Sequence, residues 1–231
     1  MATTMKAAIL HGREDIRIER VPVPEAAPGE LIVRVEAALT CGTDLKVFRR
    51  GYHARMIVPP ALFGHELAGT VVEAGEGVTD FAPGDRVVAL NSAPCGQCFF
   101  CGRGQENLCD DLLFNNGAYA EFIRIPARIV AKNTLHVPGH VPLEHAALTE
   151  PLACAVHGFE DSNAHPGDTI AVIGGGPLGA NDSACGCAGR LRNDRHCQTR
   201  WPGGGSAAVG RFPRGADYKH PQGDPRDARF D

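Results

Sequence analysis

The stretch Gly64-His65-Glu66-Leu67-Ala68-Gly69 decides how this chain folds, because it places an imidazole and a carboxylate directly before an apolar run over residues 68–72. Glycines at both ends of the stretch, and again at Gly75, allow the backbone to turn and to approach a neighbour closely. A His-Glu pair by itself is more often a solvated or salt-bridged surface pair than part of a metal site. In this frame, however, we expect the pair at a strand edge that faces a cleft.

The remaining donors of a mixed metal site lie upstream and downstream of this pair. Cys41 offers a thiolate, and Glu150 offers a second carboxylate besides Glu66. A thiol, an imidazole and carboxylates on a single ion are typical of a zinc site that keeps one position open for water or substrate. A buried structural cysteine is the alternative for Cys41, and the presence of His65 disfavours it. The pattern therefore predicts a metal-dependent enzyme.

Four clustered cysteines give the most specific signal in the chain. Cys95, Cys98 and Cys101 recur at three-residue intervals, and Cys109 follows shortly after. This spacing returns four sulfurs to a common centre and predicts a tetrahedral zinc with no open position, which makes it structural rather than catalytic. An iron–sulfur cluster also uses closely spaced cysteines, but its usual spacing and its following proline are not matched.

Short runs broken by Pro and Gly dominate residues 5–132 and are typical of an all-β, barrel-like domain. Pro142 to about Gly158 favours a helix instead, because proline suits a first helical position and the apolar residues share one face. Pro151 should kink or split this helix and leave Glu150 at the break. The predicted strands are residues 5–10, 16–20, 30–37, 68–72, 85–90, 117–126 and 128–132.

An apolar, parallel-type strand at residues 168–173 precedes a Gly-x-Gly-x-x-Gly pattern. In such a pattern Gly174 makes the tight turn, Gly176 lets a pyrophosphate approach the backbone, and Gly179 allows helix and strand to pack closely. The pattern predicts the opening of a Rossmann domain, with NAD or NADP as the cofactor.

The Rossmann pattern stops at Ala180. Residues 181–231 lack the apolar helix and the second strand that should follow, and no strand precedes Asp194 to give it a ribose-binding role. They carry nine Lys/Arg and six Asp/Glu, a net charge of +3, against −7 for residues 1–180. We expect a non-homologous, disordered, frameshift-like tail and no stable NAD(P) site in the chain as written. A basic RNA-binding tail is the disfavoured alternative.

Composition limits the remaining function classes. With 231 residues, 43% hydrophobic content and a net charge of −4, the chain can bury a real core and gives no reason to expect nucleic acid as a partner. No apolar run approaches the roughly 18 residues that cross a membrane, and residues 1–6 lack the order of a secretory signal. Nine clustered cysteines favour thiolates on metal in a reducing compartment, so we expect a cytoplasmic protein without a membrane partner.

These motifs resemble those of the zinc-containing medium-chain dehydrogenase/reductase family, from residue 5 to about residue 180. The frame over residues 64–78 and the four cysteines match the family's patterns, and residues 150–154 (Glu-Pro-Leu-Ala-Cys) are similar to its polyol and threonine dehydrogenase branches. The resemblance implies a mixed α and β fold: a GroES-like β-barrel catalytic domain over residues 1–165, then the first strand and glycine turn of an incomplete Rossmann domain over residues 166–180.

The resemblance also implies a catalytic zinc on Cys41, His65 and either Glu66 or Glu150, with the choice between the two glutamates left open. Thr43 would take the first step of a proton relay from the bound alcohol. The implied activity is hydride transfer between a secondary alcohol, polyol or amino alcohol and NAD(P), in a protein whose intact relatives are homo-oligomers. The alternative is a catalytically inactive, zinc-binding GroES-like fragment.

Two further positions near the predicted metal site are left with less defined roles. Asp44 would orient His65 by accepting its second ring N–H. Residues 48–60 form a basic and aromatic segment that either lines a substrate cleft or forms a solvated loop, and His53 within it is assigned no role.

Overall fold

The computed structural model describes residues 3–163 together with Gly176, residues 178–179, Asn181 and the short segments 198–200 and 206–208. The chain divides into two units, Met1–Cys154 and Ala155–Asp231, each compact by itself. Gly174 and the predicted domain boundaries after residues 165 and 180 lie outside the described residues, as does most of the predicted tail.

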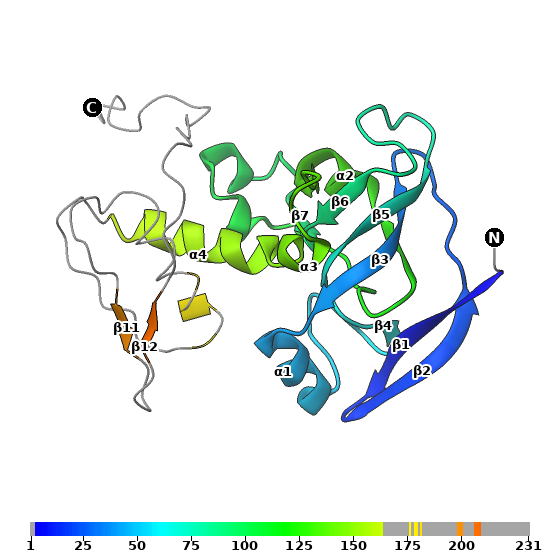
Figure 1. Ribbon diagram of the computed structural model, residues 1–231, viewed down its shortest axis with the longest axis horizontal. Coiled ribbons are helices and arrows are strands. Elements are labelled where there is room, and N and C mark those ends of the chain that lie inside the picture. The colour runs from blue at the N-terminus through cyan, green and yellow to red at the C-terminus, as the bar shows by residue number, and fades with distance from the viewer. Residues whose placement is uncertain are drawn as a thin grey trace. The chain divides into compact units, whose positions relative to one another are not determined.

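Two antiparallel sheets form the core of the first unit (Figure 1). The larger has the strand order β10-β6-β5-β3-β9 and the smaller the order β2-β1-β4. Hydrogen bonds from Ala8 N to Tyr119 O (2.9 Å) and from Glu121 N to Lys6 O (3.1 Å) join the sheets through the segment before β9. The strands are β1 Thr4–Gly12, β2 Asp15–Pro22, β3 Leu31–Leu39, β4 Ala61–Leu62, β5 Glu66–Ala74, β6 Arg86–Ala89, β9 Phe122–Ile125 and β10 Thr134–His136, with a separate pair β7 Ser92–Ala93 and β8 Leu113–Phe114. The predicted mixed fold with a β-rich first domain is confirmed.

The main core lies between the larger sheet and a short helix. Leu31 and Val33 of β3 and Leu67 and Val71 of β5 are each at most 3% exposed and pack with Ile129. Alternate residues of a strand point to the same face, so the apolar residues at every second position of β3 and β5 all face this core. Burial of this shared face fixes β3 beside β5.

The pairing of β3 with β5 positions the His-Glu motif. Leu39, at the end of β3, pairs with Glu66 at the start of β5. An added Cβ at Gly69 would clash with the backbone oxygen of Arg34 on β3, so glycine is required there for the strands to pair. As a result, the residues that follow β3 lie beside those that precede β5.

Two helices differ from the prediction. α1, Gly42–Arg50, occupies a segment whose pattern predicts no helix. α2, Ala127–Asn133, replaces the strand predicted at residues 128–132, which was therefore wrong. Ile129 and Val130 are buried on this helix, and the short apolar run that suggested a strand is equally compatible with one buried helical turn.

The helix predicted from Pro142 is present but divided. α3 spans Leu143–Ala146 with Pro142 as its N-cap, and α4 spans Thr149–Asp161. The break precedes Glu150, so Pro151 lies in the first turn of α4, where a missing N–H costs nothing. The helix divides at residues 147–148 rather than at Pro151, so the predicted break at Glu150 was wrong, and Glu150 lies inside the first turn of α4.

The second unit is described only in part. It includes the end of α4 and an antiparallel pair of short strands, β11 Gln198–Arg200 and β12 Ser206–Ala208. Among the helices that the structure describes, none combines the length and apolarity needed to cross a membrane.

Candidate functional site

Cys41 lies between β3 and α1 and caps the helix. Its Sγ accepts a hydrogen bond from Thr43 N at 3.2 Å, and Asp44 Oδ2 in turn accepts one from Cys41 N at 2.9 Å. This reciprocal capping box starts α1 at a strand end and holds both side chains in place. The sulfur is thereby fixed on rigid backbone.

His65 joins this sulfur to this carboxylate. Its Nε2 lies 3.2 Å from Cys41 Sγ, and its Nδ1 lies 3.1 Å from Asp44 Oδ1. Asp44, His65 and Glu66 are at most 5% exposed. The donor atoms of Cys41, His65 and Glu66 lie within 4.8 Å of one another. An aspartate on Nδ1 is the usual outer partner of a histidine whose Nε2 binds a metal.

The charges around this cluster favour a cation. Burial alone would lower the pKa of His65, but the hydrogen bond to Asp44 and the charges of Asp44, Glu66 and Glu150 outweigh it and raise that pKa. Burial raises the pKa of Glu66, and the charges of Glu150 and Asp44 add to this effect against the opposing charge of His65. Three carboxylates and a thiol therefore surround one imidazole, an excess of negative charge that a divalent cation balances.

Glu150 stands next to the cluster rather than in it. It lies in the first turn of α4, and its charge acts on both His65 and Glu66. Its Oε1 accepts a weak hydrogen bond from Cys154 Sγ at 3.5 Å. Of the two glutamates named by the sequence, the structure brings Glu66 into the tight group of donor atoms and leaves Glu150 at its rim.

Tyr119 supports the cluster from a distant part of the chain. Its hydroxyl lies 3.0 Å from Asp44 Oδ2, 2.9 Å from Leu39 O and 2.9 Å from Thr40 Oγ1. Burial and the charge of Asp44 both raise the pKa of this hydroxyl, so it stays a hydrogen-bond donor. Gly64, at φ +84°, packs on the ring, where an added Cβ would lie 2.7 Å from it. The sequence did not indicate this role for Tyr119.

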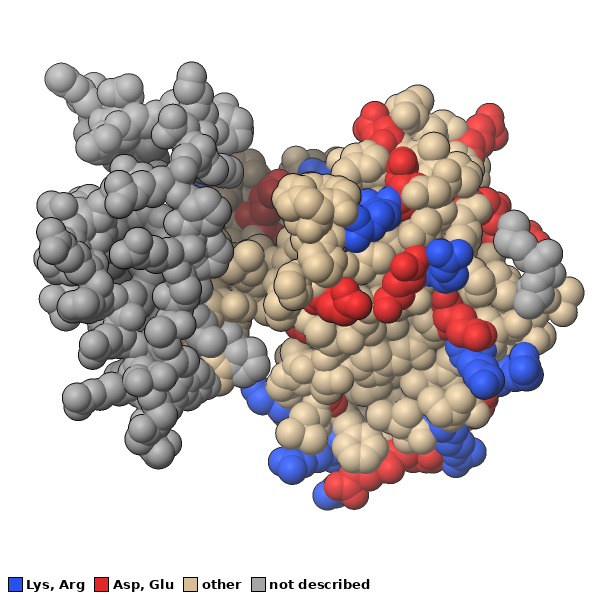
Figure 2. Space-filling model, viewed as in Figure 1, with Lys and Arg blue, Asp and Glu red and all other residues tan. Residues whose placement is uncertain are grey.

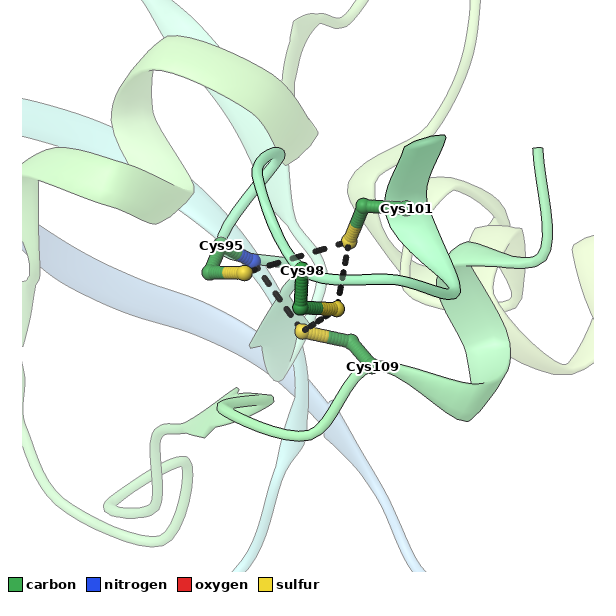
Figure 3. A group of neighbouring side chains, drawn as sticks. All are labelled: Cys95, Cys98, Cys101 and Cys109. Carbon is green, nitrogen blue, oxygen red and sulfur yellow. Dashed lines mark hydrogen bonds between the residues drawn. The ribbon is translucent and has the colours of Figure 1, made fainter. Parts of the chain in front are cut away.

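The four predicted cysteines converge on one centre, formed by the loop between β7 and β8 (Figure 3). The Sγ atom of Cys98 lies 3.5 Å from that of Cys101 and 3.9 Å from that of Cys109. The Sγ atom of Cys95 lies 4.0 Å from that of Cys101. Tetrahedral zinc with Zn–S bonds of about 2.3 Å requires S···S distances of about 3.8 Å. Backbone N–H groups of Cys101 and Asp110 lower the pKa of Cys98 to about 6, whereas burial raises the pKa of Cys101, so the four thiols ionise together only when a cation balances their charge. Zinc fits this set in ligand type, number and spacing.

The three glycines assigned to cofactor binding are less defined. Gly176 is exposed in a bend and Gly179 is half-buried in a helical turn, while Gly174 lies outside the described residues. The structure thus brings together the side chains of each predicted metal cluster, but it gives no geometry for a pyrophosphate site.

Comparisons with known proteins agree with this geometry. Residues 27–138 match the alcohol dehydrogenase GroES-like domain. The chain is 35% identical to sorbitol dehydrogenase of Bacillus subtilis over 181 residues, 76% of this chain and 50% of that protein. It is 37% identical to L-threonine 3-dehydrogenase of Pyrococcus abyssi, over 78% of this chain and 51% of that protein. The structure of a putative zinc-binding dehydrogenase from Sinorhizobium meliloti bound to NADP is similar, with a TM-score of 0.73, 36% identity, and coverage of 82% of this chain and 55% of that one.

The chain contains an alcohol dehydrogenase GroES-like domain and is similar to zinc-binding dehydrogenases. The Sinorhizobium meliloti protein is described as zinc-binding and its structure contains NADP, and all the proteins named above are described as dehydrogenases. The chain spans about half the length of the curated relatives it matches.

Proposed function

We propose that this chain carries the metal site of a zinc-dependent dehydrogenase that transfers hydride between a secondary alcohol, polyol or amino alcohol and NAD(P). The observation that carries the proposal is the buried group of Cys41, His65 and Glu66, whose donor atoms lie within 4.8 Å of one another with Asp44 bound to His65. The substrate classes follow those named for sorbitol, erythritol/L-threitol and L-threonine dehydrogenases among the relatives.

The residues of the proposed catalytic zinc site have three different roles. Cys41, His65 and either Glu66 or Glu150 would hold the zinc, which would supply the Lewis acidity that makes a substrate hydroxyl more acidic. Asp44 accepts a hydrogen bond from Nδ1 of His65 and so holds the ring with Nε2 facing Cys41 Sγ. Thr43, whose backbone N–H contacts Cys41 Sγ, offers its hydroxyl oxygen as the first acceptor for the proton of the substrate.

The other proposed sites complete the assignment. Cys95, Cys98, Cys101 and Cys109 hold a structural zinc, because four thiolates leave no coordination position open. The glycine turn after residue 173 is the proposed contact for the pyrophosphate of NAD(P). Free thiols near metal are maintained in a reducing compartment, so we place the protein in the cytoplasm.

A zinc-binding domain without dehydrogenase activity is the second candidate. It is favoured by one observation: all donors of both metal clusters lie within the single compact unit Met1–Cys154. Metal binding by this unit therefore does not by itself require a working cofactor site.

Turnover of a substrate panel separates the two candidates. Zinc-loaded protein is incubated with NAD⁺ or NADP⁺ and with sorbitol, threitol, L-threonine, 2,3-butanediol and the anionic alcohol glycerol 3-phosphate, and formation of reduced nicotinamide is followed. The dehydrogenase predicts turnover that falls at least about 100-fold in Glu66→Gln or Glu150→Gln. Glu144→Gln, an exposed glutamate of α3, is the matched control and should keep full activity. Two bound zinc ions without turnover of any substrate would favour the second candidate.

A further inference from the structure

A small pocket opens beside the metal site, against α1. Its volume is about 200 Å³. It adjoins the metal cluster through Thr43, whose backbone nitrogen lies 3.2 Å from Cys41 Sγ. We call it the basic pocket, and it is lined by Thr43, Lys46, Val47, Arg50, Tyr52 and His53.

One face of α1 builds most of this basic pocket. Thr43, Lys46, Val47 and Arg50 follow the spacing i, i+3, i+4 and i+7, which places them on the same side of a helix. Val47 is 3% exposed and anchors the helix, while Lys46 and Arg50 are exposed one turn apart. Like charges at this spacing disfavour a helix unless an anion lies between them.

Neither cation has a partner within the described part of the chain: no ion pair there includes Lys46 or Arg50. The single acidic residue of α1 is Asp44, which is 3% exposed and already accepts hydrogen bonds from His65 and Tyr119. The two positive charges are therefore available to a ligand.

His53 adds a neutral donor. Its Nδ1 accepts hydrogen bonds from the backbone N–H groups of Arg55 (3.3 Å) and Met56 (3.1 Å). A backbone N–H only donates, so Nδ1 must carry a lone pair and the ring proton must be on Nε2. Tyr52, about half exposed, and Thr43 add hydroxyl groups. The basic pocket thus combines two cations with three further donors and contains no carboxylate.

A local excess of positive charge sets this surface apart. Residues 42–56 contain four Lys/Arg and one Asp/Glu, whereas residues 1–180 carry a net charge of −7. In Figure 2, Lys and Arg side chains gather at the lower left of the described part of the molecule, where Figure 1 places α1. Such a local excess of positive charge attracts anions to this position.

We propose that the basic pocket binds an oxyanion, a phosphate monoester or a carboxylate, that is carried by the substrate of the adjacent metal site. Guanidinium and ammonium groups are the cations that proteins use for such oxyanions. The proposal rests on the proposed function, because it assigns the anion to the molecule whose hydroxyl reaches the metal. Lys46 and Arg50 then select an anionic alcohol over a neutral polyol.

Calorimetric titration of the full chain tests this assignment at low salt. The probes are inorganic phosphate, glycerol 3-phosphate, L-lactate and, as the neutral control, glycerol. Lys46→Gln and Arg50→Gln should each weaken binding of the anion about fivefold, the loss of one exposed charge contact. Arg49→Gln removes the same charge from α1 without touching the pocket and should leave binding unchanged. Lys46→Arg keeps the charge and should restore binding.

Metal dependence identifies the anion as part of the substrate. Glycerol 3-phosphate or L-lactate should bind more tightly to zinc-loaded than to chelator-treated protein, whereas inorganic phosphate should bind equally to both. Preference for the phosphate or for the carboxylate probe tells which oxyanion is used.

Three results would overturn the inference: no saturable binding of any anion, equal weakening by Arg49→Gln, or displacement of the bound anion by NADH. Zinc content measured on the same samples keeps the two proposals apart. Absent zinc refutes the proposed function, while normal zinc without anion binding refutes the pocket alone.

Discussion

Replacing Tyr119 by phenylalanine tests how far the metal cluster depends on its supporting hydroxyl. The change removes contacts of 2.9–3.0 Å to Leu39 O, Thr40 Oγ1 and Asp44 Oδ2 and leaves the ring in place. A hydrogen bond to a charged group contributes about 1.5–3 kcal/mol, and Asp44 Oδ2 keeps its bond from Cys41 N. We therefore expect a loss of about 1.5–2 kcal/mol in unfolding free energy.

The same substitution should weaken zinc binding. Asp44 holds His65 through Nδ1, and partners of this kind typically contribute 10–100-fold to metal affinity when removed directly. Tyr119 acts one step further out, so we expect a loss near 10-fold for Tyr119→Phe and a larger one for Asp44→Ala.

Urea unfolding and competition with a chromophoric chelator measure these two effects. Tyr52→Phe removes a hydroxyl from a half-exposed ring and should leave the unfolding free energy within about 0.5 kcal/mol. If Tyr119→Phe changed neither stability nor zinc affinity by more than that control, the proposed support of Asp44 by Tyr119 would be refuted.

Three further predictions test other parts of the account. Gly64→Ala should destabilise the domain by about 2 kcal/mol or more, because φ is +84° and the new Cβ would meet the Tyr119 ring; an unchanged melting temperature would contradict this. Cys101→Ala should remove one zinc and make the loop between β7 and β8 susceptible to protease, whereas retention of that zinc would exclude a four-cysteine site. Hydrogen bonds from Thr70 and, to a lesser degree, Arg34 lower the pKa of Glu36. The stability that the ionised Glu36 contributes to the fold is therefore present above pH 4.5 and is lost as the pH falls. The stability of Glu36→Gln and wild type should therefore differ by less than about 0.5 kcal/mol at neutral pH and converge as the pH falls below 4.5; a stability difference that grows as the pH falls would contradict this.

The β domain was predictable because its signals are local. Alternating apolar residues bounded by Pro and Gly gave β1, β2, β3, β5 and β6 close to their observed limits. The four cysteines were equally readable, since their spacing alone returns the sulfurs to one centre.

The parts that were missed depend on packing or on long-range contacts. α1 buries only Val47 and Asp44, so it shows no apolar stripe and relies on the capping box at Cys41 instead. α2 is too short for periodicity to distinguish helix from strand. Tyr119 meets Asp44 across 75 residues, a contact that no local pattern contains.

Zinc content per chain of the purified protein decides whether both clusters bind zinc. We expect close to two zinc ions in wild type, one lost in His65→Ala and the other retained, because the two clusters share no ligand. Less than one zinc in wild type, or two zinc ions in His65→Ala, would contradict the assignment of Cys41, His65 and Glu66 as a metal site.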